Sequence, residues 1–126
     1  MRNDLLRQRC LYAIASIYLI IALLALVSPD KLAAHMGFLL LNTNGYSEFY
    51  AIYLGVWTAN AALALLAARR IREALLGDLS ALFLLAQPAA RLIAALLIAW
   101  PKGNTAFIML AEVIGGLLLL WIRPSS

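Results

Sequence analysis

Residues 10–27 read CLYAIASIYLIIALLALV, an apolar stretch that contains no charged side chain. At about 20 residues per crossing of the bilayer core, this stretch is long enough to span a membrane as a helix. Three further apolar stretches of similar length follow at about residues 49–68, 74–100 and 105–122. In lipid, every backbone group must form its hydrogen bond within the protein, which favours helices. The connections between the stretches are short, which favours antiparallel neighbours. The pattern therefore predicts an all-α bundle of four antiparallel transmembrane helices.

The composition leads to the same class. Of the 126 residues, 65% are hydrophobic and only 13% are charged, whereas a soluble domain normally carries about a quarter charged residues. This argues against a soluble enzyme. The basic residues bracket the apolar stretches instead of forming a basic face, so no nucleic-acid partner is expected. Cys10 is the only cysteine, which excludes an internal disulfide and a cysteine-based metal site. We expect one membrane domain over residues 1–126, with no metal and no cofactor.

The basic residues also predict the orientation. Most of them flank the spans on one side: Arg2, Arg7, Arg9, Arg69, Arg70, Arg72 and Arg123. The other side carries only Lys31 and Lys102. The positive-inside rule then predicts a multi-pass protein of the cell (inner) membrane with both termini in the cytoplasm. The first stretch is long for the apolar region of a signal peptide, so a retained span is the preferred interpretation.

The segment 28–47 is too polar to cross the membrane. Ser28-Pro29-Asp30 is typical of an N-cap followed by proline at the first helical position. The apolar residues that follow share one helical face: Leu32, Met36, Leu39 and Leu40. They predict a short amphipathic helix on the outer interface that ends in the turn-prone Asn42–Tyr46. A plain connector is the alternative.

Two charged residues lie deep inside the predicted spans. Arg91 is ten residues before Pro101, roughly 15 Å from the outer end of its span at 1.5 Å per residue. Glu112 is seven residues after Thr105, roughly 10 Å from the outer end of the next span by the same rise. Because neighbouring antiparallel spans bring them to similar depth, we expect an Arg91–Glu112 ion pair. It is either a clamp that holds the helix register or part of a ligand cavity.

Further polar and aromatic residues fall in the same outer half. Glu48 begins the second span, where it either complements the helix macrodipole or lies at the mouth of the cavity above Arg91. Gln87 lies one turn before Arg91, next to Pro88, which is expected to kink that span. A stripe at helical spacing continues below Glu48: Tyr50, Tyr53, Trp57 and Asn60. The stripe is either core packing or a set of faces and hydroxyl groups for a ligand.

Three classes of function fit these residues. The first is a site for a lipophilic small molecule, with Glu48, Arg91 and Glu112 as candidate catalytic residues. Its ligand-binding residues would be Tyr50, Tyr53, Trp57, Asn60 and Gln87. A carboxyl group in a low-dielectric site can act as general acid or base, so the enzymatic version is a cofactor-independent isomerase or cyclase of isoprenoid-like or sterol-like substrates. The second is a non-catalytic accessory or scaffold subunit, and the third is a small dimeric transporter. The expected partners are membrane lipids, the lipophilic ligand and, in a homo-oligomer, a second copy.

Five short motifs carry a family resemblance: Ser28-Pro29-Asp30, Glu48–Gly55, Arg91-Leu-Ile, Pro101-Lys-Gly103 and Ala111-Glu112-Val. Through them the chain resembles a bacterial family of small four-helix membrane proteins known only as a domain of unknown function. Such proteins typically open the second span with Glu-x-Arg and Tyr-Gly-Gly, whereas here Tyr50 stands in the arginine position and Leu54 replaces the first glycine. The resemblance implies the four-helix fold and marks Glu48, Arg91 and Glu112 as positions of interest. It implies no activity.

Overall fold

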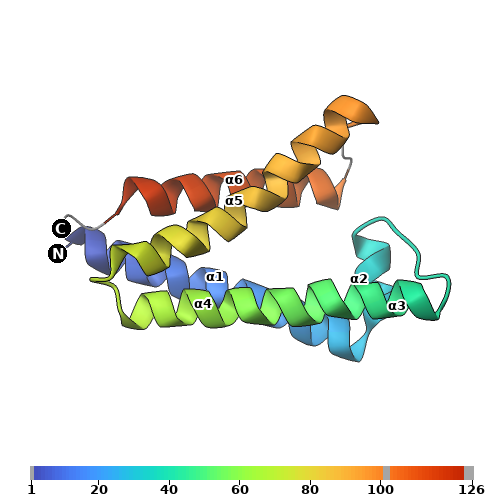
Figure 1. The fold of residues 1–126 in the computed structure, drawn as a ribbon, viewed down its shortest axis with the longest axis horizontal. Helices are drawn as coiled ribbons and strands as arrows, with labels where there is room; N and C mark the ends of the chain where they lie inside the picture. Colours follow the sequence, from blue (N-terminus) through green and yellow to red (C-terminus); the bar gives the residue numbers. More distant parts are fainter. Residues whose placement is uncertain (1, 101–102, 124–126) are drawn as a thin grey trace.

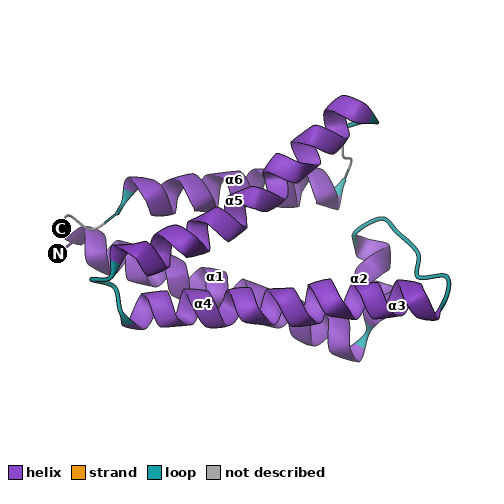
Figure 2. Cartoon of the chain, viewed as in Figure 1, coloured by secondary structure: helices purple, strands orange, loops and turns teal. Residues whose placement is uncertain are grey.

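A computed structural model describes residues 2–100 and 103–123, and the regular secondary structure in these ranges is entirely helical (Figure 2). The elements are α1 (Arg2–Val27), α2 (Pro29–His35), α3 (Thr43–Phe49), the π-helical segment η1 (Tyr50–Val56), α4 (Trp57–Arg69), α5 (Ala74–Leu97) and α6 (Asn104–Trp121). The segments α3, η1 and α4 follow one another without a break and form one long helix. Pro101 and Lys102, used above in the resemblance and in the charge count, lie outside the described residues.

Three helical segments are long and apolar enough to cross a membrane: Asp4–Val27, Thr43–Arg69 and Ala74–Leu97. The segment Ala106–Trp121 is apolar but shorter. The predicted all-α class is therefore confirmed, with helices suited to a membrane. Two of these helices begin well before the apolar stretches predicted at residues 10 and 49, because polar residues at a helix end still continue the backbone hydrogen-bonding pattern.

The helices are arranged as two packed pairs, α1 with α4 and α5 with α6, and the contact between α4 and α5 joins the pairs. In Figure 1 the start of α1, the end of α4, the start of α5 and the end of α6 lie together at one end of the molecule. The short helices α2 and α3 lie at the opposite end. This up-and-down order is the one that short connections impose on neighbouring helices.

Small side chains allow the first pair to pack closely. Ala64, Ala67 and Ala68 of α4 are buried against Leu11 and Ala15 of α1. Small residues at a helix–helix contact let the two backbones approach closely. In lipid, where the hydrophobic effect does not drive helices together, the van der Waals contacts of such a close approach are a main source of packing energy. The α1–α4 pair is thus closely packed, and the second pair lies against it through the contact of α5 with α4.

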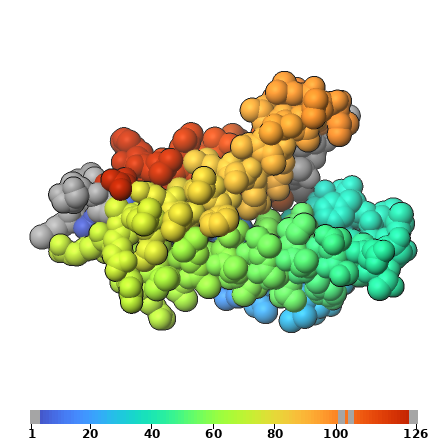
Figure 3. All heavy atoms as spheres, viewed as in Figure 1, coloured from blue at the N-terminus to red at the C-terminus, as the bar shows by residue number. Residues whose placement is uncertain are grey.

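The second pair diverges from the first at the end that carries α2 and α3. Pro88 lies inside α5, and a proline in a helix interior removes one backbone hydrogen bond and bends the helix. In Figure 1 the second half of α5 turns away from α4, and Figure 3 shows the end of α5 standing apart from α2 and α3.

The predicted short helix is present, but it is shorter than the apolar pattern suggests. Pro29 occupies its first turn, and Gly37, with a φ of +88°, terminates it in the left-handed region. Leu39 and Leu40, which the pattern placed on the same helical face, therefore fall in the following loop. Asn42 does not only make a turn: its Oδ1 accepts a hydrogen bond from the Gly45 amide at 2.9 Å and caps α3.

An ionic cluster closes the other end of the bundle. Arg7 Nη2 of α1 donates to Asp78 Oδ1 of α5 at 3.0 Å, and Arg123 Nε after α6 donates to Asp78 Oδ2 at 2.8 Å. Arg7 is only 1% exposed, although in the sequence it served only as one of the basic residues that predict the orientation in the membrane. Its guanidinium lies over Gly77, where a side chain would leave no room for it. The cluster links three helices at the end opposite α2.

Candidate functional site

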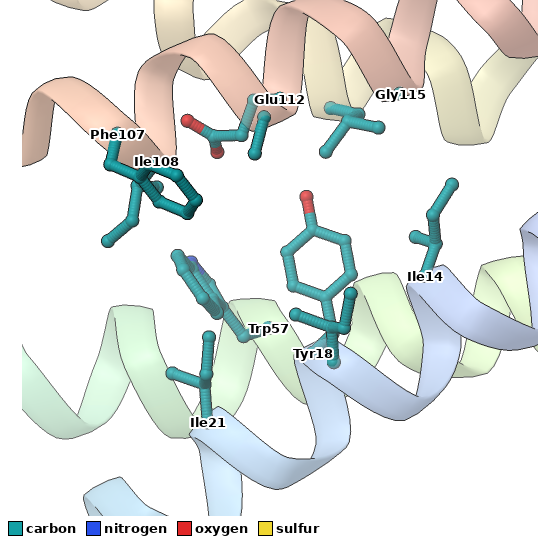
Figure 4. Close-up of a pocket in the computed structure, with 11 residues that line it drawn as sticks. Ile14, Tyr18, Ile21, Trp57, Phe107, Ile108, Glu112 and Gly115 are labelled. Carbon is teal, nitrogen blue, oxygen red and sulfur yellow. The ribbon is translucent and has the colours of Figure 1, made fainter. Parts of the chain in front are cut away.

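A cleft of about 350 Å³ lies between α1 and α6 and reaches Trp57 at the start of α4 (Figure 4). The lining is almost entirely apolar: Ile14, Ile17, Tyr18, Ile21, Trp57, Leu84, Phe107, Ile108, Ala111, Glu112 and Gly115. On α1 and on α6 the lining residues recur three and four positions apart, so each helix presents one face to the gap. Ala111 and Gly115 contribute little side-chain volume to the α6 wall, which leaves the space open.

Glu112 is the charged residue in this lining, and it is paired. Arg91 Nη1 of α5 donates a hydrogen bond to Glu112 Oε1 of α6, in an ion pair whose side chains are 22% and 8% exposed respectively. The ion pair expected from the sequence is thus present in the structure. Glu112 lines the cleft, whereas Arg91 binds the Glu112 carboxylate from α5 and is not part of the lining. The negative charge of the buried carboxylate is therefore balanced by a residue outside the cleft.

Tyr18 is a polar residue of the cleft that the sequence analysis did not single out. Its hydroxyl accepts a hydrogen bond from Gln87 Nε2 at 3.0 Å, and the buried Asn60 lies near the same hydroxyl. In Figure 4 Tyr18 points from α1 toward α6, so that its hydroxyl and the Glu112 carboxylate enter the gap from opposite walls. Tyr12 and Ser16 also interrupt the first apolar stretch, and nothing in the sequence distinguishes Tyr18 from them.

An aromatic row leads from α3 to the cleft. Its ring centroids are 4.6 Å apart from Phe49 to Tyr53, 5.1 Å from Tyr53 to Trp57 and 5.0 Å from Trp57 to Tyr18. Phe49, and not Tyr50, takes the first position of this row. In the wider π-helical winding of η1, residues three apart lie further from a common face than in an α-helix. Tyr50 is accordingly turned away from Tyr53 toward the end of α1, where its hydroxyl donates to the Leu26 carbonyl at 3.4 Å.

The structure therefore brings some of the candidate residues together and leaves others apart. Trp57 and Glu112 line the cleft, Arg91, Gln87 and Asn60 surround its polar groups, and Tyr53 packs behind Trp57. Tyr50 lies outside this group. Glu48 is exposed on α3, and among the described residues it forms no ion pair with Arg91.

A second hollow of about 300 Å³ continues the cleft toward α2. It shares three lining residues with the first one, Ile21, Phe107 and Ile108. The remaining lining comes from the short helix and its end: Leu32, His35 and Met36. The two hollows are thus neighbours, and the same three side chains border both of them.

Together, the helices and the cleft define a small all-α protein with membrane-compatible helices. The chain belongs to the family described as Domain of unknown function (DUF4345), whose model matches residues 6–123. This confirms the resemblance seen in the sequence motifs. No match was found among curated proteins or among solved structures.

Proposed function

We propose that this protein is a four-span protein of the cell (inner) membrane that binds a lipophilic small molecule in the cleft between α1, α4 and α6. The fourth span would be α6, which has 18 residues. At 1.5 Å per residue such a helix is about 27 Å long, close to the roughly 30 Å of the hydrocarbon core. Its packing along α5 supports a common membrane-spanning direction.

The placement of charge supports both termini on the cytoplasmic side. Arg7, Arg123 and the turn between α4 and α5, with Arg69, Arg70 and Arg72, lie at one end of the bundle, and Lys31 lies on α2 at the other. The positive-inside rule assigns the arginine-rich end to the cytoplasm. The short helix α2, with Leu32 and Ala33 buried and Lys31 exposed, would then lie along the outer interface.

One observation carries the binding function: an apolar cleft into which two polar groups, the Glu112 carboxylate and the Tyr18 hydroxyl, point from opposite walls. Small-molecule sites typically combine an apolar lining with a few convergent polar groups, in volumes of about 300–1,000 Å³. A buried ion pair contributes little net stability, because desolvation of the charges offsets their attraction. The Arg91–Glu112 pair is therefore better explained by a ligand than by stability alone.

The test is to fill the cleft and to look for the ligand. Protein purified from its membrane would be analysed by native mass spectrometry, as wild type and as Ala111→Phe, which places a bulky ring in the cleft. The control is Ala94→Phe, an equally exposed alanine on α5 outside the cleft lining. We expect a bound lipophile in the wild type and the control and its loss in Ala111→Phe. A wild-type protein without such a mass would favour the scaffold function instead.

Acid–base catalysis on the bound lipophile is a second candidate, favoured by the same facing pair. The Glu112 carboxylate can accept a proton and the Tyr18 hydroxyl can donate one, which are the two roles an isomerase or cyclase needs. Glu48 is exposed on α3, away from Glu112 and Tyr18, and has no role in this catalytic mechanism. The recovered lipophile would be incubated with the protein in deuterated water. Deuterium uptake that requires Glu112 and is absent in Glu112→Gln would support catalysis, and no uptake with the wild type would leave binding alone.

A further inference from the structure

We infer that the cleft selects an elongated, uncharged lipophile that carries one hydroxyl group, and that it discriminates against carboxylic acids and amines of the same chain length. This inference rests on the proposed function and names the chemical class of its ligand. It depends on three features: the two neighbouring hollows, the balanced charge at Glu112 and the hydrogen-bonding groups of the cleft.

The shape of the space requires an elongated ligand. The cleft and the second hollow share Ile21, Phe107 and Ile108 and continue as far as α2. Along α6 alone, the lining extends from Gly115 to Phe107, which is about 12 Å at 1.5 Å per residue. A compact ring system would fill only one of the two hollows, whereas a linear chain can occupy both.

The charges around the cleft require a neutral ligand group. Glu112 and Arg91 carry opposite charges and are already paired. A ligand carboxylate beside Glu112 would meet a like charge, and an ammonium group would compete with Arg91 and leave it unpaired. Because an unpaired charge away from water is unfavourable, both ionised groups should be excluded from this position.

The polar groups of the cleft match a hydroxyl. The Glu112 carboxylate accepts hydrogen bonds and donates none, and the Tyr18 oxygen is a further polar partner on the opposite wall. A ligand hydroxyl can donate a hydrogen bond to the Glu112 carboxylate, and it can accept one from, or donate one to, the Tyr18 hydroxyl. An alkane in the same place would leave both protein groups facing an apolar chain, which costs free energy.

Trp57 provides the measurement, because it lines the cleft. The variant Trp100→Phe/Trp121→Phe keeps Trp57 as the single tryptophan among the three in the chain. Trp57 fluorescence would be titrated in nanodiscs at neutral pH with a brominated alcohol, carboxylic acid and amine of equal chain length. Bromine quenches tryptophan on contact, so quenching reports occupancy. We expect the alcohol to quench at a concentration roughly tenfold lower than the acid or the amine.

Charge-removing variants sharpen the test. In Glu112→Gln the positive charge of Arg91 is no longer balanced, so the preference should move toward the acid. In Arg91→Gln the carboxylate is unbalanced, so it should move toward the amine. The occlusion variant Ala111→Phe, made in the same single-tryptophan background, corrects for partition of the probes into the lipid.

The outcomes separate this inference from the proposed function. An acid or an amine that quenches wild-type Trp57 as well as the alcohol does would overturn the selectivity and leave the binding function standing. Quenching by every probe that is the same in the wild type and in Ala111→Phe would remove the binding function, and the inference with it. The titrations of the wild type and of Ala111→Phe decide both points even if a charge-removing variant does not fold.

Discussion

The hydroxyl of Tyr18 on α1 accepts a hydrogen bond from Gln87 Nε2 on α5 at 3.0 Å. This bond joins the α1–α4 pair to the α5–α6 pair across the interior. Gln87 is one helical turn from Arg91, which holds Glu112 on α6. Two polar contacts, Gln87–Tyr18 and Arg91–Glu112, thus start one turn apart on α5 and reach α1 and α6, the two helices that wall the cleft.

Removal of the Tyr18 hydroxyl should weaken the connection between the two pairs. In Tyr18→Phe the Gln87 amide loses its partner, and hydrogen bonds of this kind contribute on the order of 1 kcal/mol inside membrane proteins. Thermal unfolding in detergent should show a lower midpoint. The matched control is Tyr12→Phe on the same helix, because Tyr12 is exposed. An equal effect of the two substitutions would contradict the role assigned to the Tyr18–Gln87 bond.

The Arg91–Glu112 pair should be strongly non-additive. Arg91→Met leaves a buried carboxylate without its partner, and Glu112→Leu leaves the guanidinium alone. Loss of one member of a buried pair typically costs about 3–5 kcal/mol, whereas replacement of both is often close to neutral. We expect each single variant to be destabilised and the double variant to recover most of the lost stability.

The same double variant separates a clamp from a binding site. If the pair serves the ligand, the stable Arg91→Met/Glu112→Leu protein should no longer retain the bound lipophile in native mass spectrometry. A double variant that keeps both its stability and the bound mass would assign the pair a structural role only.

Gly77 should not tolerate a methyl group. A Cβ at this position would lie 2.7 Å from Arg7 Cζ, whereas a Cβ at Gly55 meets only the Tyr50 carbonyl oxygen at an ordinary 3.8 Å. Overpacking of a filled interior costs about 1–3 kcal/mol. Gly77→Ala should therefore lower the unfolding midpoint in detergent, and Gly55→Ala, the control, should change it little. A tolerated Gly77→Ala would mean that Arg7 is not held over α5 as described.

The proposed topology can be read from single cysteines. In a Cys10→Ser background, Asn44→Cys at the start of α3 and Arg72→Cys in the turn after α4 are both exposed positions. If the arginine-rich end is cytoplasmic, a membrane-impermeant thiol reagent should label Asn44→Cys in intact cells. It should label Arg72→Cys only after the membrane is opened. The reversed pattern would invert the proposed orientation.

The Arg91–Glu112 pair was predictable because chain order and helix rise alone bring the two residues to similar depth on adjacent helices. Tyr18 was not predictable, because its role depends on which way α1 is rotated about its axis, and an all-apolar helix carries no polar stripe to show this. Glu48 does not lie near Arg91 and Glu112 for a related reason: it is on α3, on a helix surface that faces outward.

The aromatic stripe was predicted one residue out of place. The spacing of Tyr50, Tyr53 and Trp57 fits an ordinary α-helix, but the structure places Phe49 in the row because η1 is wound as a π-helix. The segment packs against α1, and the hydrophobic pattern, which is apolar on every side of this segment, gives no sign of its winding.

The all-α class, helices of membrane length and the pairing of two opposite charges follow from the amino-acid sequence alone. These properties depend on apolar length, helix rise and chain order, which are independent of how the helices are rotated. Which side chains face the cleft, the place of Tyr18 in it and the burial of Arg7 follow only from the folded chain. They depend on the close approach of α1 and α4 at their alanines and on the packing of α6 along α5. Both are properties of helices in contact, and a linear pattern of residues does not contain them.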